Sequence, residues 1–433
     1  MSESIAINPK GGLSGIINIP GDKSISHRSV MFAALASTPV IIKNFLYAQD
    51  CLSTVSCMQA LGAKIEKDES NNLHVLGQGL LGLKEPENIL DAGNSGTTLR
   101  LLSGILVGQS FFSVLTGDAS LRSRPMARVV TPLTMMGGNI KGRQGAKYVP
   151  IAIMKSKADK IHGIEYTMPM ASAQVKSAIL LATLFASSPS IITEPYVSRD
   201  HTELMLETFG VQVKREGTSV SINPVDELHA PAEICVPGDI SSAAFWLVGA
   251  TIIPNSRLIL KNVGINPTRT GILDILKEMG ADITIENQRF SGAEPVADLV
   301  VQSAELKGAV IDGAIIPRLI DEIPILSVAA LFAKGKTIIR GAEELRVKET
   351  DRLKAVASEL GKMGAIITET DDGLIINGPQ ELRFADCDSY HDHRMAMSLA
   401  IAGSASQGVS IHKPDCANIS YPNFFATLDS IRK

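Results

Sequence analysis

Aromatic residues, charges and cysteines are all scarce in this sequence. Phe, Trp and Tyr make up 4% of its 433 residues, which disfavours a single-strand nucleic-acid surface, because such surfaces stack bases on aromatic rings. The formal net charge is −4, so there is no general attraction for polyanions, and an anionic ligand would need a local group of cations. We expect no nucleic-acid partner.

The five cysteines form no CxxC pair and no regular framework. Such an odd, sparse set is typical of reduced thiols in a cytosolic protein. The N-terminus, MSESIAINPK, has neither a basic start nor an apolar core, so no signal peptide is expected. The longest apolar stretch, residues 323–333, is interrupted by Pro324 and Ser327 and is too short to span a bilayer. These features predict a cytoplasmic protein without membrane contact.

Apolar residues, in contrast, are plentiful. They form 45% of the chain against 20% charged residues, and nothing in the composition suggests disorder. Glycine, alanine, isoleucine and leucine are abundant, which favours layered α/β packing. A length of 433 residues predicts two domains of roughly 200 residues each.

A short motif occurs five times and predicts the ends of five helices. It consists of an apolar residue, two others, a second apolar residue, a glycine and then an alternating apolar run. One copy would be an ordinary helix end, but the glycines lie 75, 73, 70 and 84 residues apart, which indicates a repeat. Each copy is expected to be a helix with a glycine C-cap, followed by a strand. The glycines are Gly62, Gly137, Gly210, Gly280 and Gly364.

A second recurring feature predicts the starts of six helices. It is a polar turn that opens into an alanine-rich helix. Six starts in this length give units of about 70 residues, which is large for a solenoid repeat and favours six small α/β units. The last helix, residues 424–431, reaches the end of the chain without a glycine cap. The turns lie near Ser24, Ser95, Ala173, Ser241, Glu322 and Asp392.

These repeats predict two domains with three units each. Domain 1 is expected to comprise residues 1–20 and 238–433, and domain 2 residues 21–237. The N-terminal strand, residues 5–8, would complete the sixth unit and so belong to domain 1. The chain would pass between the domains near Pro20 and near Pro237, and such a double crossing is a natural hinge.

The run PGDKSISHR, residues 20–28, is the most informative segment for function. It places Lys23, Ser24 and Arg28 where an extended segment becomes a helix, and a helix start offers free N–H groups and a positive dipole end to an anion. The side chains add charge and donors for phosphate or carboxylate oxygens. Residues 237–241 read PGDIS, 217 positions after the first copy, and keep the turn and the cap without the cations.

Similar polar segments occur at the other expected helix starts. Each by itself is ordinary: a Gly/Ser/Thr turn is usually a cap, a carboxylate at a helix start an N-cap, and a mixed charge run a solvated helix face. The segments are GNSGTTLR (93–100), LRSRPM (121–126), SAQVK (172–176), RDHTE (199–203), the pair Asp321 and Glu322, RVKETDR (346–352) and DHR (392–394).

Taken together, these segments gather cations at helix starts. If the six starts point inward, an interdomain cleft collects them, and we expect the active site there. A phosphate monoester carries about −1.5 to −2 charges at neutral pH, so two phosphates with carboxylates would match the set. The cations are Lys23, Arg28, Arg124, Arg199, Lys348, Arg352 and Arg394.

Three familiar motifs do not apply. The run from Gly77 to Gly82 satisfies GxGxxG, but Pro86 follows and no helix is expected there, so a dinucleotide site fails. His391 and His393 have no third ligand at a suitable spacing, so no metal is expected. The phosphate-loop pattern GxxxxGK followed by Ser or Thr does not occur, which counts against a P-loop kinase.

In combination the motifs closely resemble those of the 5-enolpyruvylshikimate-3-phosphate (EPSP) synthase family, along the whole chain. The resemblance implies a two-domain inside-out α/β barrel built of six βαβαββ units, with the substrate site between the domains. The matching stretches are PGDKSISHR, GNSGTTLRLL, SRPM, RVKETDRL and DHRMAM, while SAQVK, RDHTE and NPTR (266–269) resemble the class II branch.

The resemblance implies transfer of an enolpyruvyl group from phosphoenolpyruvate to the 5-hydroxyl of shikimate 3-phosphate, with release of phosphate. It implies no metal or organic cofactor, and we expect a monomer. Shikimate 3-phosphate would be bound by Lys23, Ser24, Arg28, Ser172, Ala173, Gln174, Arg199, Asp321 and Lys348. Phosphoenolpyruvate would be bound by Lys23, Asn94, Gly96, Thr97, Arg124, Gln174, Glu349, Arg352 and Arg394.

Four side chains would take part in the chemistry. Asp321 would accept the proton of the attacking hydroxyl, and Glu349 would protonate the methylene carbon, with Lys23 and His393 assisting. Addition across the double bond needs one group that gives a proton to carbon and another that takes one from the hydroxyl. The cations would offset the repulsion between two anionic substrates and stabilise the intermediate.

Two positions refine the comparison with the family. Many members carry a lysine just before a segment like Tyr-Pro near the C-terminus, where this chain has Ile419, Ser420 and Tyr421. Gly96 resembles the glyphosate-sensitive members, whereas a tolerant class II form carries alanine. We therefore expect glyphosate to compete with phosphoenolpyruvate.

Three other functions compete with this interpretation. The sister enzyme that transfers enolpyruvyl to a UDP-sugar such as UDP-N-acetylglucosamine relies on a loop cysteine, and residues 116–124 contain none. A phosphosugar or nucleotide kinase could use helix-start phosphate sites, but the P-loop is missing. A non-catalytic anion-binding protein with the same fold would not need Asp321 and Glu349.

Overall fold

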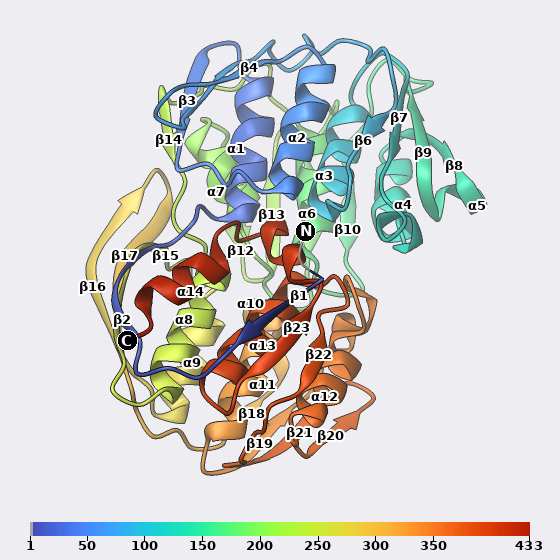
Figure 1. The fold of residues 1–433 in the computed structure, drawn as a ribbon. Coiled ribbons are helices and arrows are strands. Elements are labelled where there is room, and N and C mark those ends of the chain that lie inside the picture. The colour runs from blue at the N-terminus through green and yellow to red at the C-terminus, as the bar shows by residue number, and fades with distance from the viewer. Residues whose placement is uncertain (1–2) are drawn as a thin grey trace. The chain divides into compact units, whose positions relative to one another are not determined.

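The computed structural model describes residues 3–433, and the chain divides into two compact units (Figure 1). Unit 1 comprises the described residues up to Pro20 together with Gly238–Arg289 and Pro295–Lys433. Unit 2 comprises Gly21–Pro237 and Phe290–Glu294.

One short segment does not follow the division expected from the sequence. Residues 290–294 were expected in domain 1 but belong to unit 2. They lie at the turn of the hairpin β16–β17, where Glu294 Oε1 lies 2.7 Å from His201 Nδ1 and Ser291 Oγ donates to the Cys235 carbonyl at 2.6 Å. Because these partners are distant in the chain, no local pattern could have predicted the assignment.

Unit 2 contains three four-stranded sheets with one common pattern. In each, an edge strand runs parallel to its neighbour and the other two strands are antiparallel. The first sheet has β14 (Glu233–Cys235), β3 (Pro39–Lys43), β5 (Leu73–Leu76) and β4 (Lys64–Lys67), with helices α1 (Lys23–Leu35) and α2 (Gln49–Ala60). The second has β6 (Leu90–Asp91), β7 (Ser113–Thr116), β9 (Tyr148–Met154) and β8 (Asn139–Gly142), with α3 (Gly96–Leu106) and α4 (Ala127–Met135). The third has β10 (Glu165–Thr167), β11 (Ser190–Thr193), β13 (Ser219–Ile222) and β12 (Val213–Glu216), with α6 (Ala173–Thr183) and α7 (His201–Thr208).

Unit 1 repeats this pattern twice and varies it once. Its first sheet has β2 (Ser14–Asn18), β15 (Arg257–Gly264), β17 (Glu294–Gln302) and β16 (Asp282–Ser291), with α8 (Ile240–Ile252) and α9 (Gly271–Met279). Its second has β18 (Val310–Ile311), β19 (Gly335–Ile339), β21 (Gly373–Gly378) and β20 (Ile367–Thr370), with α11 (Ile323–Phe332) and α12 (Arg352–Lys362). Its third has only three strands, β22 (Asp386–Asp388), β23 (Val409–His412) and β1 (Ser4–Ile7), with α13 (His393–Ser404) and α14 (Phe424–Ile431).

The N-terminal strand therefore completes the last sheet. β1 pairs antiparallel with β23, in the position that the hairpin strand takes in the other five repeats, as Figure 1 shows. The βαβαββ pattern is thus complete in five repeats and shortened in the sixth, and among residues 3–433 the strands form six separate open sheets. The shorter elements are α5 (Arg143–Ala146), α10 (Ile316–Leu319) and the 3₁₀ turns η1 (Leu121–Ser123), η2 (Gly313–Ile315), η3 (Ile320–Glu322), η4 (Glu343–Val347) and η5 (Pro414–Ile419).

The echo of PGD in the sequence marks an exchange of strands. β2 precedes Pro20 in the chain but shares a sheet with β15, while β14 precedes Pro237 but shares a sheet with β3. The Asp22 N–H donates to the Pro237 carbonyl at 2.7 Å, and the Asp239 N–H donates to the Pro20 carbonyl at 2.9 Å. Asp22 and Asp239 are the N-caps of α1 and α8. The two PGD copies therefore hold the same place in two repeats.

All five predicted glycine caps are confirmed. The five glycines have φ between +81° and +100°, a region that L side chains adopt only with strain. In each case the N–H of the residue after the glycine donates to the carbonyl of the first apolar residue of the motif, at 2.8 to 3.0 Å. This is the 6→1 bond of a Schellman motif. The carbonyls belong to Met58, Leu133, Leu206, Leu276 and Leu360.

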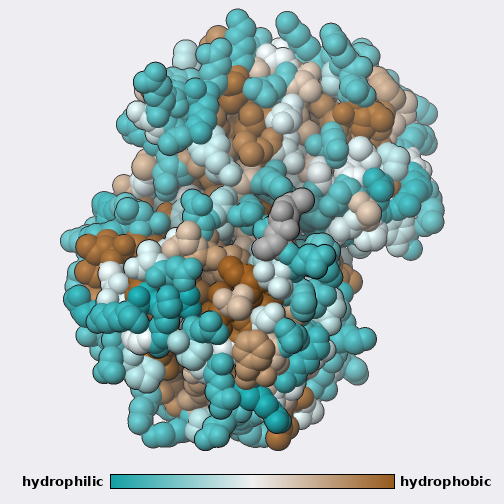
Figure 2. All heavy atoms as spheres, in the orientation of Figure 1, coloured by the Kyte–Doolittle hydropathy of each residue, from teal (hydrophilic) through white to brown (hydrophobic). Residues whose placement is uncertain are grey.

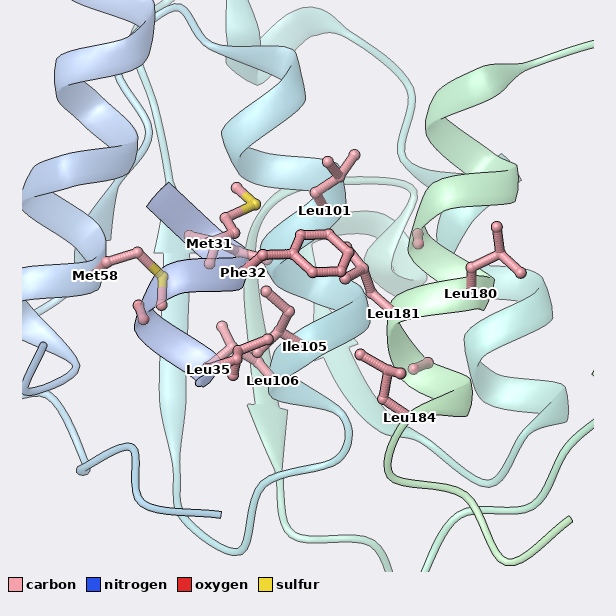
Figure 3. Packing of buried hydrophobic residues seen from close by; sticks show 14 of the residues in the cluster. Met31, Phe32, Leu35, Met58, Leu101, Ile105, Leu106, Leu180, Leu181 and Leu184 are labelled. Carbon is pink, nitrogen blue, oxygen red and sulfur yellow. The ribbon is translucent and has the colours of Figure 1, made fainter. Parts of the chain in front are cut away.

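Each unit has its own apolar core. In unit 2, Figure 3 shows side chains of α1, among them Phe32, facing leucine and isoleucine side chains of α3 and α6. The Phe32 ring also lies 5.3 Å from the ring of Phe209. In unit 1, Trp246 of α8 stacks on Phe424 of α14 at 4.8 Å and donates its indole N–H to the Tyr421 hydroxyl at 3.1 Å. Each such side chain stabilises the fold by about 1.5–3 kcal/mol when fully buried.

The surface contrasts with these cores. The face visible in Figure 2 is mainly hydrophilic in both units, with separate apolar patches. Within the described part of the chain, no helix combines the length and the apolar character that crossing a bilayer would require.

Candidate active site

The predicted phosphate-binding run lies at the start of α1, as expected. The Asp22 carboxylate caps the helix by accepting the Ile25 N–H at 2.9 Å. Lys23 and Ser24 follow in the first turn and are half-buried. The ammonium of Lys23 lies 3.1 Å from Asp50 Oδ2 of α2, a partner that the sequence had not indicated. This ion pair holds the lysine side chain at the helix start.

Arg28 lies one turn further along α1 and is buried. Its Nε donates to Thr202 Oγ1 at 2.7 Å, one terminal nitrogen to the Ser24 carbonyl at 2.9 Å, and the other to Ser177 Oγ at 2.8 Å. Burial lowers the pKa of Arg28 to about 10, against the opposing effect of Glu203. A guanidinium has five N–H donors, and these contacts use three of them.

Around the start of α3, the predicted residues Gly96, Thr97 and Gln174 lie close together. Arg100, which was not predicted as a site residue, contacts Gln174. Ser95 caps the helix by accepting the Thr98 N–H at 3.1 Å. The amide of Gln174 accepts a hydrogen bond from Arg100 at 2.5 Å and donates to Thr97 Oγ1 at 3.2 Å. A Cβ added to Gly96 would lie 2.6 Å from an Arg100 nitrogen. Arg100 could have been found from its spacing, because residues four apart share a helix face.

Arg124 belongs to the same neighbourhood in unit 2. Its guanidinium donates to Asn94 Oδ1 at 2.8 Å and to Ser120 Oγ at 3.1 Å. The Asn94 amide in turn donates to Asp118 Oδ2 at 2.7 Å. A Cβ at Gly96 would lie 3.7 Å from an Arg124 nitrogen. The structure therefore brings four predicted residues of this unit together, namely Asn94, Gly96, Thr97 and Arg124.

The start of α6 carries two further predicted residues beside Gln174. Ser172 is its buried N-cap residue, and Ala173 and Gln174 form the first turn. Arg199 stands two residues before α7 and is half-buried. The charge of Arg199 contributes to lowering the pKa of Arg28, so the two guanidiniums lie within electrostatic reach of each other.

Unit 1 contains a cluster of both charge signs, with Arg352 at its centre. Arg352 is 1% exposed and donates to Asp321 at 3.2 Å, to Glu349 at 2.7 Å and to Asp392 at 2.8 Å. Burial alone would lower the pKa of Arg352, but the three carboxylates outweigh it and raise that pKa. Asp392 also caps α13 by accepting the Arg394 N–H at 2.8 Å. A single buried cation thus links α12, α13 and the turn before α11.

Lys348 and Arg394 border the same cluster. Lys348 Nζ and an Arg394 nitrogen each lie 3.9 Å from a carboxylate oxygen of Asp321. The neighbouring Glu322 was interpreted as a possible N-cap, but its side chain makes no capping bond; it accepts from Ser241 Oγ and lies 3.6 Å from Arg394. The local pattern could not reveal this, since Ser241 is 81 residues away.

The start of α13 carries the last predicted residue. His393 is buried at the first position of α13. No group of three His, Cys, Asp or Glu side chains is arranged to hold a metal ion within residues 3–433. Tyr421, in the segment where many family members have a lysine nearby, is buried, and burial raises the pKa of its hydroxyl to about 12.

The two units offer different chemistry. In unit 2 Lys23 lies in the first turn of α1, Arg100 in the second turn of α3 and Arg124 in the loop before α4. Hydroxyl and amide groups accompany these cations, an arrangement suited to phosphate and carboxylate groups. In unit 1 the carboxylates of Asp321 and Glu349 stand next to cations, so proton transfer and charge stabilisation can occur together.

The fold is that of the enolpyruvyl transferases. A solved enolpyruvyl transferase, NikO from Streptomyces tendae, superposes with a TM-score of 0.79 and covers 99% of this chain and 97% of its own, at 17% identity. The crystal structure of EPSP synthase from Acinetobacter baumannii has a TM-score of 0.89 and 43% identity, covering 100% of this chain and 98% of its own.

The sequence comparisons define the family. The model of the EPSP synthase (3-phosphoshikimate 1-carboxyvinyltransferase) family matches residues 7–428. The 3-phosphoshikimate 1-carboxyvinyltransferase of Desulforudis audaxviator is 54% identical over 430 residues, 99% of each chain. That of Thermoanaerobacter pseudethanolicus is 51% identical over 428 residues, covering 99% of this chain and all of its own. The chain belongs to the EPSP synthase family.

Proposed function

We propose that the protein transfers the enolpyruvyl group of phosphoenolpyruvate to the 5-hydroxyl of shikimate 3-phosphate and releases phosphate. The family membership over residues 7–428 supports this reaction. The observation that carries the proposal is the cluster around Arg352, where Asp321 and Glu349 lie on the same guanidinium at 3.2 and 2.7 Å. Two carboxylates held together by one buried cation suit a reaction that takes one proton and gives another.

Residues of both units serve the same two substrates in this proposal. Phosphoenolpyruvate is bound by the cations and donors at the start of α3 and in the Arg352 cluster. Shikimate 3-phosphate is bound at the starts of α1 and α6. The phosphoenolpyruvate set is Lys23, Asn94, Gly96, Thr97, Arg124, Gln174, Glu349, Arg352 and Arg394. The shikimate 3-phosphate set is Lys23, Ser24, Arg28, Ser172, Ala173, Gln174, Arg199, Asp321 and Lys348.

The proton transfers follow from the carboxylates. Asp321 takes the proton of the 5-hydroxyl as its oxygen attacks the substituted carbon of phosphoenolpyruvate, and Glu349 gives a proton to the methylene carbon, with Lys23 and His393 assisting. Phosphate then leaves as a proton returns from the new methyl group and restores the double bond. The cations stabilise the charged intermediate between the two steps.

Two further properties belong to the proposal. The sparse cysteines form no disulfide within residues 3–433, and Cys51, Cys57, Cys387 and Cys416 are buried thiols, which favours action in the reducing cytoplasm. Both proposed residue sets come from a single chain, so a monomer suffices. Light scattering of the purified protein measures the molar mass directly, and a stable dimer would contradict the monomer.

One assay tests the reaction. Phosphate release from phosphoenolpyruvate is measured with shikimate 3-phosphate, with UDP-N-acetylglucosamine, or with no acceptor. We expect release only with shikimate 3-phosphate. Release with the UDP-sugar would assign the sister reaction, and release without an acceptor would indicate hydrolysis. No release in any arm would support a binding protein.

A further inference from the structure

A buried lysine without an assigned role lies in unit 2 beside the proposed shikimate 3-phosphate residues. Lys176 belongs to α6, two residues after Gln174, and its side chain is 2% exposed. Its ammonium lies 2.7 Å from Glu194 Oε2 and 2.8 Å from Glu203 Oε1. We refer to Lys176, Glu194 and Glu203 as the buried triad.

The buried triad joins three separate elements. Lys176 comes from α6, Glu194 follows β11 directly, and Glu203 lies in the first turn of α7. One ammonium stands between two buried carboxylates, so one negative charge is in excess. Burial alone lowers the pKa of Lys176 and raises that of Glu203, and with the mutual attraction included the pKa of both groups lies above its ordinary value. Charges buried this deeply persist only when they are paired and hydrogen-bonded.

Glu194 also holds the loop that leads to Arg199. The Ser198 N–H donates to Glu194 Oε2 at 3.2 Å, and the Ser198 hydroxyl donates to the other carboxylate oxygen. The Ser198 carbonyl accepts from Lys176 at 3.3 Å. All three polar groups of Ser198 are therefore bound by the triad. Arg199 is the next residue, so its backbone starts from a fixed point.

Arg199 needs a fixed backbone position because another cation, Arg28, lies near it. Arg199 and Arg28 are close enough for the charge of Arg199 to contribute to the lowered pKa of Arg28. The two positive charges oppose each other, while Glu203, Asp22 and Glu294 attract Arg28, and an anion bound near both guanidiniums relieves their repulsion. A loosely held Arg199 would move away in the free protein, and ligand binding would then have to pay for its return.

We propose that Glu194, held by Lys176, is a positioning residue for Arg199 and thereby sets the affinity for shikimate 3-phosphate. This inference rests on the proposed function, in which Arg199 binds shikimate 3-phosphate. Glu194 itself does not touch the substrate in this proposal. Its effect must therefore disappear when the arginine side chain is absent.

The main variant is Glu194→Gln. It keeps the size of the side chain and leaves Lys176 paired one to one with Glu203, so no buried charge is left without a partner. We expect the Kd of shikimate 3-phosphate, measured by calorimetry without phosphoenolpyruvate, to rise about tenfold. The KM for phosphoenolpyruvate and kcat should stay within about twofold of the wild type, a split that a general loss of structure would not produce.

The matched control is Glu207→Gln. It makes the same substitution in α7 and removes an ion pair, but that pair, with Arg215 at 2.5 Å, is solvent-accessible. Its Kd should equal that of the wild type. A tenfold rise in Glu207→Gln as well would show that the effect is not specific to the triad and would overturn the proposal.

The decisive test is the double variant with Arg199→Ala. Arg199→Ala alone should raise the Kd, and Glu194→Gln should then add less than about twofold, because residues that act through one another are not additive. A full tenfold increment in the Arg199→Ala background would overturn the positioning role. If Arg199→Ala raises the Kd but Glu194→Gln does not, the inference fails alone. If Arg199→Ala has no effect, the assignment of Arg199 in the proposed function fails, and the inference fails with it.

Ser198→Ala keeps the test valid if Glu194→Gln does not fold. It removes only the hydroxyl bond to Glu194 and leaves every charge of the triad in place. We expect a smaller rise in Kd in the same direction, again absent in the Arg199→Ala background. An unchanged Kd in folded Ser198→Ala protein would contradict the proposal.

Discussion

Replacing Asp321 by asparagine removes a proton acceptor while keeping the shape of the Arg352 cluster. Asp321 accepts from Arg352 at 3.2 Å, and Lys348 and Arg394 each approach it to 3.9 Å. An asparagine oxygen can still accept the hydrogen bond of Arg352, but an amide cannot take up a proton at neutral pH. The variant therefore separates the proposed proton transfer from substrate binding.

The expected loss of activity is large. General base catalysis contributes about 10²–10⁴-fold, so we expect kcat to fall about 100-fold or more, equivalent to roughly 2.7 kcal/mol of barrier. Both KM values should stay within about threefold.

The expected loss of stability is limited. Four carboxylates of the cluster face three cations, and Glu344 lies 3.5 Å from Lys348 as a fifth, so removing one negative charge leaves no cation in excess. Asp321 is 15% exposed, and asparagine keeps an oxygen that accepts from Arg352, so the loss of unfolding free energy should stay below the roughly 3–5 kcal/mol that removal of a buried partner costs. The carboxylates are Asp321, Glu322, Glu349 and Asp392, and the cations are Lys348, Arg352 and Arg394.

Steady-state phosphate release at saturating substrates measures kcat, and thermal denaturation checks the fold. Asp351→Asn is the matched control, because Asp351 is adjacent to Arg352 in the chain but pairs with Arg346 at 2.9 Å. Asparagine also remains a good N-cap for α12, so activity should be unchanged. A kcat of Asp321→Asn within about threefold of the wild type would refute the assignment as base. An equal loss in both variants would show that the effect is not specific to Asp321.

Three further predictions concern inhibition, pH and the helix caps. A Cβ in Gly96→Ala would lie 2.6 Å from an Arg100 nitrogen, so we expect a higher KM for phosphoenolpyruvate and weaker competitive inhibition by glyphosate than in the wild type; unchanged inhibition kinetics would contradict this crowding. Burial, and after it the charge of Lys23, lowers the pKa of His27 well below 6.5. Below pH 6.5 the unfolded chain therefore binds a proton that the folded chain does not. The stabilising contribution of neutral His27 is fully present above pH 6.5 and is lost as the pH falls. Measured by calorimetry, the free energy of unfolding should fall with pH more steeply in the wild type than in His27→Gln, by up to about 1.4 kcal/mol per pH unit. Parallel curves for the two proteins would contradict a role of His27 in this pH dependence. Gly364→Ala should destabilise the fold by about 1–2 kcal/mol because Gly364 has φ +96°. Gly361→Ala in α12, where an added Cβ meets nothing within 4 Å, should stabilise it by about 0.5–1 kcal/mol. Urea unfolding measures both changes in unfolding free energy, and changes of the same sign would contradict the role of Gly364 as a helix cap.

Helix boundaries could be predicted because their causes are local. A glycine at the end of a helix adopts positive φ without strain, and the residue after it closes the Schellman bond within the same six residues. Gly62 and Gly280 are examples, with φ of +98° and +100°. A capping carboxylate such as Asp22 likewise needs only the N–H three residues ahead. The six helix starts and five glycine caps can therefore be predicted from the sequence.

Some residues of the predicted site do lie at those starts, among them Lys23, Gly96 and Ala173. The sequence did not predict which side chains these residues contact. Asp50 pairs with Lys23, Arg100 binds the amide of Gln174, and neither pair is close in the chain. Residue types in a motif indicate which groups could bind an anion, but they carry no information on the side chain that will face them.

By itself, the sequence determined the repeats, the helix ends and the residue types gathered at the helix starts, because each depends on interactions within a few residues. The tertiary structure alone decided which charges are paired. Arg352 binds Asp321 and Asp392 across 31 and 40 residues, and Lys176 reaches Glu194 across 18. Such contacts exist only after distant segments pack together and exclude water, which is also what makes the paired charges strong enough to hold a site in place.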